Sequence, residues 1–245
     1  MHTITGKTVL VTGANRGIGR ALLEEALNRG AKRVYAGTRQ PFGHPDGRVT
    51  AVTLDVTDAE QIAQAAKTVG ELDVLVNNAG EVTFDDLSDR AVLEKMFAVN
   101  FFGVYDTIQA FLPALIRSQG AIINNISVNA FAPFPLVSSY SAAKAAAFNL
   151  SQSLRGLLAG KGVGVHAVMT GLVDTDMTKG FDVMAKAAPE HVAKNVYDGL
   201  EKGEEEIFPD AMAEPLADSW RSGGGKNLER QYAQMAAQIA AAQSA

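Results

Sequence analysis

Short apolar runs alternate with longer amphipathic segments along most of the chain. Seven runs have the length and β-branched content of buried strands: Thr8–Thr12, Arg33–Gly37, Val49–Thr53, Val74–Asn77, Ala121–Ile126, Val163–Met169 and Glu206–Phe208. Segments between them have the length and period of helices that connect parallel strands, among them Ala59–Val69, Leu93–Ser118 and Ser141–Leu158. This alternation predicts an α/β fold: a doubly wound, seven-stranded parallel sheet flanked by helices.

The 245 residues fit one domain of the larger kind. Two places interrupt the pattern: a turn at Pro41–Gly47 and a flexible break at Ser222–Gly225. The tail, residues 222–245, is predicted to end in a helix, because apolar residues recur there at helical spacing. These residues are Leu228, Tyr232, Met235 and Ile239. We expect the stripe to dock on the chain's own domain or on a neighbouring subunit.

Composition narrows the class of protein. Hydrophobic residues make up 47% and charged residues 20%, enough for a substantial core. A net charge of −5 without a basic stripe argues against nucleic acid as a partner. The absence of cysteine is compatible with a reducing compartment, and no apolar run approaches a membrane span. We therefore expect a cytoplasmic protein without a membrane partner.

Metal chemistry finds no support in the sequence. A metal site would have to use four scattered histidines, His2, His44, His166 and His191. No two of them have the spacing of paired ligands on one helix or short loop. We predict no metal site.

A glycine-rich turn follows the first predicted strand. Thr8–Val11 leads into Thr12-Gly13-Ala14-Asn15-Arg16-Gly17-Ile18-Gly19, and a helical pattern follows. Glycines at such a junction allow a tight turn, close approach of the backbone to a pyrophosphate, and close packing of helix on strand. Phosphates can then bind the free amides at the positive end of the helix.

A tyrosine and a lysine stand four residues apart at Tyr140 and Lys144. On a helix this spacing places both side chains on one face. There the ammonium should lower the pKa of the phenol, so that Tyr140 exchanges protons near neutral pH.

These motifs, taken in order, resemble those of the classical short-chain dehydrogenase/reductase family. The ordered set is Thr12-Gly13-x-x-x-Gly17-x-Gly19, then Asn77-Asn78-Ala79-Gly80, then Tyr140-x-x-x-Lys144. The resemblance runs from about Gly6 to about Met177 and implies one Rossmann domain over residues 1–245. It also implies a hydride-transferring oxidoreductase with a nicotinamide cofactor.

The resemblance assigns four catalytic residues: Ser127, Tyr140, Lys144 and Asn100. Ser127, thirteen residues before Tyr140, would hydrogen-bond the substrate oxygen, to which Tyr140 would deliver a proton. Lys144 would lower the pKa of the tyrosine and hold the nicotinamide ribose. Asn100 would distort its helix and hold a water beside the lysine.

The cofactor site extends over several strand ends. The resemblance assigns the pyrophosphate and adenosine ribose to the glycine turn, the adenine to the end of the third strand, and the nicotinamide side to the fourth and sixth. The assigned residues are Gly13, Asn15, Arg16, Gly17, Ile18, Gly19, Asp55, Val56, Asn78, Ala79, Gly80, Tyr140, Lys144, Gly171, Val173 and Thr175. Thr170 stands where the family usually has proline, which frees φ and should loosen nicotinamide placement slightly.

The second strand decides the choice of cofactor. An NAD-binding fold usually offers a carboxylate there, but this chain offers Thr38 and then Arg39. An arginine suits a 2′-phosphate, and Arg16 in the glycine turn could supply a second cation. We therefore expect NADP(H).

The substrate side reads as apolar. Residues 178–189 would form a lid, with Phe181, Val183 and Met184 available to cover a substrate. Between Ser127 and Tyr140 stand Phe131, Phe134, Leu136 and Val137, which line either the pocket or the core. No charged residue is placed to anchor a carboxylate, so a small neutral carbonyl or secondary alcohol is the expected substrate.

Two other functions use related folds. A regulator that senses NADP without turnover would not need Ser127, Tyr140 and Lys144 together. An epimerase or dehydratase of nucleotide sugars would have a different glycine turn and a longer C-terminal region. Family likeness also suggests a homotetramer or homodimer formed through Leu93–Ser118 and Ser141–Leu158.

Overall fold

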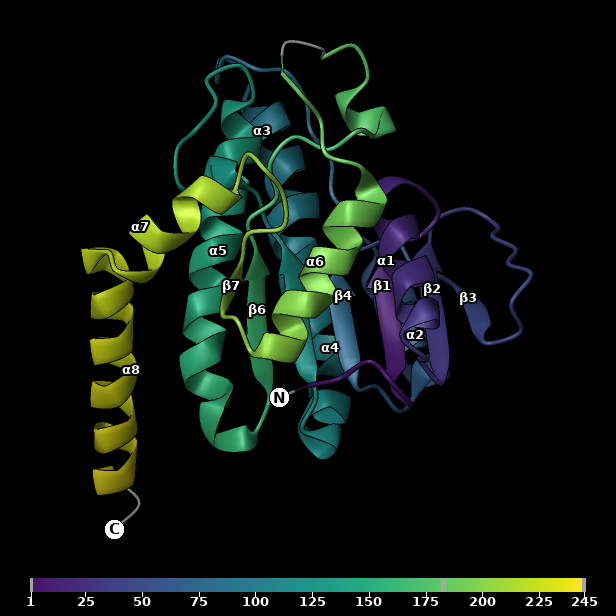
Figure 1. Ribbon diagram of the computed structural model, residues 1–245, viewed down its shortest axis with the longest axis horizontal. Helices are drawn as coiled ribbons and strands as arrows, with labels where there is room; N and C mark the ends of the chain where they lie inside the picture. Colours follow the sequence, from purple (N-terminus) through teal and green to yellow (C-terminus); the bar gives the residue numbers. More distant parts are fainter. Residues whose placement is uncertain (1, 182–183, 244–245) are drawn as a thin grey trace.

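The computed structural model describes residues 2–181 and 184–243. Seven parallel strands form one sheet in the order β3-β2-β1-β4-β5-β6-β7 (Figure 1). They are β1 Thr8–Thr12, β2 Arg33–Thr38, β3 Val49–Thr53, β4 Val74–Asn77, β5 Ala121–Asn125, β6 Gly164–Val168 and β7 Glu206–Ile207. The predicted fold class is therefore confirmed, and no strand boundary differs from the prediction by more than one residue.

The helices cover both faces of this sheet. They are α1 Gly17–Asn28, α2 Ala59–Val69, α3 Arg90–Phe97, α4 Gly103–Ser118, α5 Ser138–Leu158, α6 Pro189–Lys202, α7 Ala217–Arg221 and α8 Gly224–Gln243. Alternate residues of each strand serve the two layers. Val9 and Val11 pack with α1 and α6, whereas Leu10 packs with α2, α4 and α5.

The chain reverses its direction of winding at β1. β1 pairs with β2 on one side and with β4 on the other, in registers such as Leu10 to Tyr35 and Leu10 to Leu75. The connections therefore leave a crevice at the carboxyl ends of β1 and β4, where ligands bind in such sheets.

The helix predicted as one piece over Leu93–Ser118 begins earlier and is interrupted. Asp89 caps α3 by accepting from the Ala91 amide, and a π-helical turn, Ala98–Phe102, separates α3 from α4. Asn100, fully buried, lies within this turn. Single π-turns inside helices occur frequently at functional sites.

The start of α5 depends on a distant segment. The Asp85 carboxylate accepts from both the amide and the hydroxyl of Ser139 and so caps the helix. Because this cap comes from another part of the chain, the local sequence places the helix start three residues too late, at Ser141 instead of Ser138.

By length and composition, Arg90–Ser118 is the one helical segment among the described residues that could cross a membrane. In this structure its apolar side chains pack in the core. Ile108, Phe111 and Leu115 are buried in the core between α2, α5 and the sheet. Core packing therefore accounts for the hydropathy of this segment.

The terminal helix does not cover the body of the chain. α8 stands beside α5, attached to the body near its first turn (Figure 1). Leu228, Tyr232, Met235 and Ile239 all remain exposed. Of the two docking places expected for the stripe, the chain's own domain is thus ruled out.

Candidate active site

The glycine turn brings the first strand, the second strand and α1 together. The Gly13 amide donates to the Gly37 carbonyl of β2 over 2.8 Å. Gly17 has a φ of +53°, in the left-handed region that favours glycine. A Cβ built on Gly19 would lie 2.1 Å from the Gly13 carbonyl oxygen, so only glycine allows helix and turn to meet there.

Replacing Gly19 with alanine should destabilise the protein and weaken cofactor binding together. We expect a loss of about 1–3 kcal/mol in the free energy of unfolding, the usual cost of overpacking. Thermal unfolding and titration with a dinucleotide measure the two effects. Gly160→Ala is the control, because nothing lies within 4 Å of its built Cβ. Equal stability and affinity of the two variants would contradict the assigned role of Gly19.

The first turn of α1 has no side-chain cap. Arg16 occupies the cap position in an extended conformation, and its side chain accepts no hydrogen bond from the helix. By contrast, Asp58 caps α2 and Asp89 caps α3. Asn15 lies exposed in the turn and Ile18 packs partly on the core. The free amides of α1 therefore offer an anion site.

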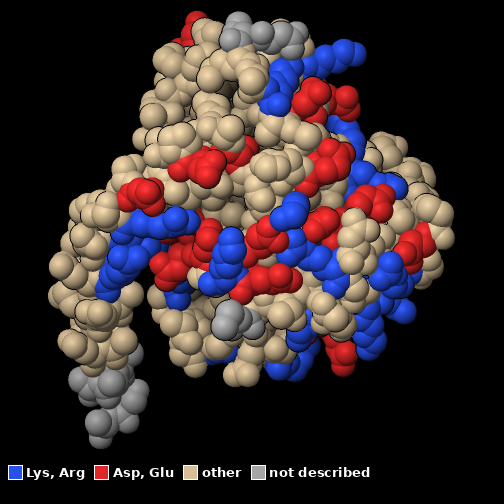
Figure 2. Space-filling view, in the orientation of Figure 1, with Lys and Arg blue, Asp and Glu red and all other residues tan. Residues whose placement is uncertain are grey.

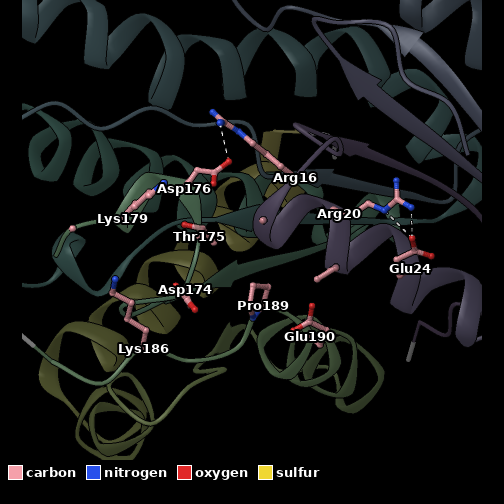
Figure 3. Close-up of a pocket in the computed structure, with 13 residues that line it drawn as sticks. Arg16, Arg20, Glu24, Asp174, Thr175, Asp176, Lys179, Lys186, Pro189 and Glu190 are labelled. Carbon is pink, nitrogen blue, oxygen red and sulfur yellow. Dashed lines mark hydrogen bonds and ion pairs between the residues drawn. The ribbon is translucent and has the colours of Figure 1, made fainter. Parts of the chain in front are cut away.

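A cavity of about 700 Å³ borders this turn (Figure 3). α1 and the start of α6 form part of its wall, and the segment after β6 forms the rest. Across its mouth the Arg16 guanidinium contacts the Asp176 carboxylate at 3.1 Å, and both side chains are exposed. Arg16 thus joins the glycine turn to the loop after β6 in this structure.

The end of β2 carries an unengaged cation. Arg39 is exposed, and within the described ranges 2–181 and 184–243 it forms no hydrogen bond or ion pair. The Thr38 hydroxyl is directed into its own turn, where it donates to the Gln40 carbonyl over 2.6 Å. Arg39 can therefore meet a phosphate without first breaking a contact.

Asp55 and Val56 follow β3 on the same edge of the sheet. The Asp55 carboxylate accepts from the amide and hydroxyl of Thr57 at 2.9 and 2.7 Å. Burial raises the pKa of Asp55, but the Thr57 hydrogen bonds and the nearby Arg39 outweigh it, so the carboxyl stays ionised. Val56 is buried and packs closely against Gly103 at the start of α4.

The turn after β4 is fastened to the glycine turn by Thr12. Its hydroxyl accepts from the amides of Asn78 and Ala79, each at 3.0 Å. The Asn78 side chain also donates to the Thr12 carbonyl at 3.1 Å. The sequence motif indicated Asn78 and Ala79, but it gave no sign that Thr12 holds them.

Gly80 and Asn100 lie next to the candidate lysine. A Cβ built on Gly80 would be 3.0 Å from Asn100 Oδ1 and 3.8 Å from Lys144 Nζ. The Asn100 amide donates to the carbonyls of Glu81 and Met96 at 2.9 and 3.0 Å. It therefore holds the turn after β4 against the interrupted helix.

Ser127, Tyr140 and Lys144 come together at the ends of β5 and α5. The Ser127 side chain lies close enough to Tyr140 to lower the pKa of the phenol. Lys144 Nζ lies 5.6 Å from the centre of the Tyr140 ring. The lysine is buried, and its ammonium donates to the Asn125 carbonyl over 2.7 Å. The three catalytic candidates thus form one constellation.

The proton affinities in this constellation differ from the sequence prediction. Burial raises the pKa of Tyr140 to about 12, although its interaction with Ser127 acts to lower it. Burial also lowers the pKa of Lys144 to about 8. The expected lowering of the tyrosine pKa is therefore wrong for the chain alone. Desolvation opposes the phenolate, and the ammonium is directed at a carbonyl of β5.

Thr170 is held by side chains that the motifs did not indicate. Its hydroxyl donates to Asn125 Oδ1 over 2.5 Å, and the Asn125 amide donates to Asn78 Oδ1 over 3.0 Å. Next to it, the Gly171 amide donates to the buried Asp210 carboxylate over 2.7 Å. These contacts fix the backbone where the usual proline is absent.

The loop after β6 closes on itself. The Val173 carbonyl accepts from the Thr178 hydroxyl at 2.5 Å, and Thr175 caps the short helix Asp176–Thr178. The methyl group of Thr175 lies against Gly17 of the glycine turn. Backbone hydrogen bonds then join Ala187, near the end of the predicted lid, to the Leu172–Asp174 segment that precedes it.

The aromatic residues before Tyr140 divide between core and mouth. Phe131 packs against Phe148 and Trp220 at centroid distances of 5.3 and 4.7 Å, which makes it a core residue. Phe134 is partly exposed and meets the Phe181 ring of the predicted lid at 5.8 Å. Leu136 and Met184 are exposed, Val137 is buried, and Val183 lies outside the described residues. The exposed members of this set, Phe134, Leu136 and Met184, are thus all apolar.

Metal ligands do not gather in this site. Within the described portion of the chain, no group of three or more His, Asp or Glu residues is arranged to hold a metal ion.

Comparisons with known proteins agree on one family. A family model described as "short chain dehydrogenase" matches residues 7–185. A short chain dehydrogenase from Burkholderia cenocepacia J2315, solved in complex with NADP, shares 35% identity and a TM-score of 0.85. The match covers 94% of this chain and 98% of that one.

Curated relatives are similarly distant. An uncharacterized oxidoreductase of Staphylococcus aureus strain MW2 is 34% identical over 211 residues, which are 80% of this chain and 91% of the relative. Estradiol 17-beta-dehydrogenase 2 of Rattus norvegicus is 33% identical over 230 residues, 86% of this chain. The match spans only 60% of the length of the rat enzyme.

Proposed function

Since the chain belongs to the short chain dehydrogenase family, we propose that it is an NADP(H)-dependent oxidoreductase acting on a neutral carbonyl or secondary alcohol. The single observation that carries the proposal is the joined constellation of Ser127, Tyr140 and Lys144 at the carboxyl edge of the sheet. When bound, the cofactor supplies or accepts the hydride. The residues of the chain bind, orient and move the proton.

Tyr140 is the proton donor in the proposed reduction. With a pKa of about 12 it keeps its proton at neutral pH, as a general acid must. Ser127 lies close enough to interact with Tyr140, so one substrate oxygen can contact both hydroxyls. Charge that develops on that oxygen is then stabilised before the proton moves.

Lys144 supplies positive charge beneath this pair. Its ammonium is held by the Asn125 carbonyl at the end of β5, within a few ångströms of Gly80 and Asn100. A cation at this depth favours the phenolate once Tyr140 has given up its proton. The lysine must therefore be protonated, which a pKa of about 8 allows at neutral pH.

The preference for a phosphorylated dinucleotide rests on two features. The uncapped amides of α1 suit a pyrophosphate, and the close contact of Gly19 with the turn lets the backbone approach it. Arg39 is exposed at the end of β2, without a hydrogen bond or ion pair among the described residues, at the place where a carboxylate would select the unphosphorylated ribose. The Burkholderia structure, solved with NADP, supports the same choice.

The exposed apolar side chains near the candidate site support a neutral substrate. Phe84, Phe134 and Leu136 are exposed. The Asp85 amide donates to the Leu136 carbonyl at 3.0 Å, which places Phe84 beside the segment that leads into α5. An uncharged ketone or aldehyde would bury these side chains, whereas a carboxylate would be desolvated beside them without a partner.

We further propose a cytoplasmic homodimer or homotetramer. The outer faces of α4 and α5 expose Tyr105 and Leu157, and Phe102 is exposed in the turn before α4. Exposed large apolar residues on adjoining helices are typical of an interface between subunits.

Turnover with a panel of carbonyl compounds tests the proposed function. The loss of absorbance of NADPH is followed with neutral ketones and aldehydes, and with keto acids of matched size as controls. We expect turnover of neutral compounds and much slower turnover of the acids. If NADPH binds but no carbonyl is reduced, and NADP⁺ oxidises no alcohol, the enzyme proposal fails and a sensing protein takes its place.

A further inference from the structure

The outward face of α8 carries an apolar seam. Leu228, Tyr232, Met235 and Ile239 follow one another at intervals of four, three and four residues. This alternation keeps one line of side chains on one side of a helix and is the spacing at which two helices pair. All four side chains are between 44% and 60% exposed, although such residues are normally covered.

The base of α8 is fixed, so the direction of the seam is fixed as well. The Lys226 ammonium, 1% exposed, lies within 2.7 to 3.0 Å of carboxylate oxygens of Glu205, Glu206 and Glu229. Arg155 of α5 binds both Glu206 and Glu229. A buried lysine with three carboxylate partners holds the helix to the body.

The side of α8 that faces the body carries other residues than the seam. A Cβ built on Gly156 of α5 would lie 3.9 Å from the Cβ of Ala233, so the two helices approach each other there. On a helical wheel Ala233 lies more than a quarter turn from the line through Tyr232 and Met235. The seam therefore points away from α5.

The amount of exposed surface points to a missing partner. The chain exposes 12009 Å². A monomer of its mass, 25.9 kDa, is expected to expose about 10,500 Å². The excess of about 1,500 Å² exceeds the roughly 800 Å² that one partner loses in an interface of standard size.

The chemistry of the seam identifies the partner. From Gln231 to the end of the sequence there is no charged residue, and glutamine and alanine flank the seam. Figure 2 shows the charged side chains of α8 only near its attached end. A membrane surface would require lysine and arginine along the polar side. Two identical uncharged seams, however, can meet about a two-fold axis without repulsion.

We propose that α8 pairs through this seam with α8 of a second copy of the chain. The pair buries the four exposed apolar side chains of each copy and leaves the glutamines at the rim. This contact is separate from the surfaces of α4 and α5, and it does not depend on the proposed enzymatic function.

Size-exclusion chromatography with light scattering on the full chain tests the pairing. Tyr232→Glu with Met235→Glu places charges in the seam, and the mass of the assembly should fall to half that of the wild type. The matched control, Gln234→Glu with Ala237→Glu, adds the same charges outside the seam and should keep the wild-type mass. Circular dichroism verifies that both variants remain folded.

Cross-linking gives an independent readout, because the chain has no cysteine. Met235→Cys should form a disulfide-linked dimer under diamide, whereas Ala237→Cys, on the side of the helix opposite the seam, should form little. A monomeric wild type, or equal cross-linking of the two cysteine variants, would overturn the proposal.

Discussion

Replacing Tyr140 with phenylalanine should lower the rate of carbonyl reduction by a factor of about 10²–10⁴, the usual contribution of a positioned general acid. The ring, its packing and the nearby Lys144 remain, so the affinity for NADPH should change little. Single-turnover kinetics with saturating NADPH measure the loss in the chemical step. A fluorescence titration of the same variant measures cofactor binding.

Tyr105→Phe is the matched control for this prediction. Tyr105 lies on α4 with its side chain partly exposed and outside the constellation. Its loss of a hydroxyl should leave turnover at the wild-type level. If Tyr140→Phe kept more than about a tenth of the wild-type rate, proton transfer by Tyr140 would contribute less than 1.4 kcal/mol, and another donor would have to be sought.

The sequence predicted a lowered pKa for Tyr140, whereas in the structure the pKa is raised, and the difference has a physical reason. Spacing on a helix shows that Tyr140 and Lys144 share a face, which the structure confirms through their 5.6 Å separation. It does not show how deeply they are buried or what else the ammonium binds. Burial and the Asn125 carbonyl decide the proton affinities, and both come from chain segments distant in sequence.

The fold was predictable because its information is local. The alternation of β-branched runs with amphipathic segments marks each strand, and β1, β3 and β4 have the predicted bounds. What could not be predicted depends on long-range contacts. The cap of α5 comes from Asp85, and the contact that holds Thr170 comes from Asn125.

In the site, too, the features set by local sequence were predictable, and those set by long-range contacts were not. The ordered motifs indicated Asn78, Ser127 and Lys144, because each occupies a fixed position at a strand end or on a helix. The motif included Thr12 without assigning it a role, and Asp210 was not singled out, since a threonine or aspartate near a strand end has many ordinary uses. Only the three-dimensional contacts, to the amides of Asn78 and Gly171, reveal what these two residues hold.

The second large effect is expected at Arg39. Arg39→Asp should weaken NADPH binding by about 10- to 100-fold, because a charge-assisted hydrogen bond to a phosphate contributes about 1.5–3 kcal/mol. NADH binding should improve relative to NADPH, since the new carboxylate can accept from the ribose hydroxyls. Titration of both dinucleotides against the wild type and the variant gives the ratio of their dissociation constants.

Arg33→Asp provides the control with the same change of charge on the same strand. Arg33 stands at the amino end of β2, whereas Arg39 follows its carboxyl end, so the two substitutions alter net charge equally but affect opposite edges of the sheet. The control should leave the NADPH to NADH ratio unchanged. If both variants shifted the ratio alike, the effect would be a general electrostatic one. If neither did, Arg16 would become the remaining candidate, and binding of the 2′-phosphate would then require its contact with Asp176 to open.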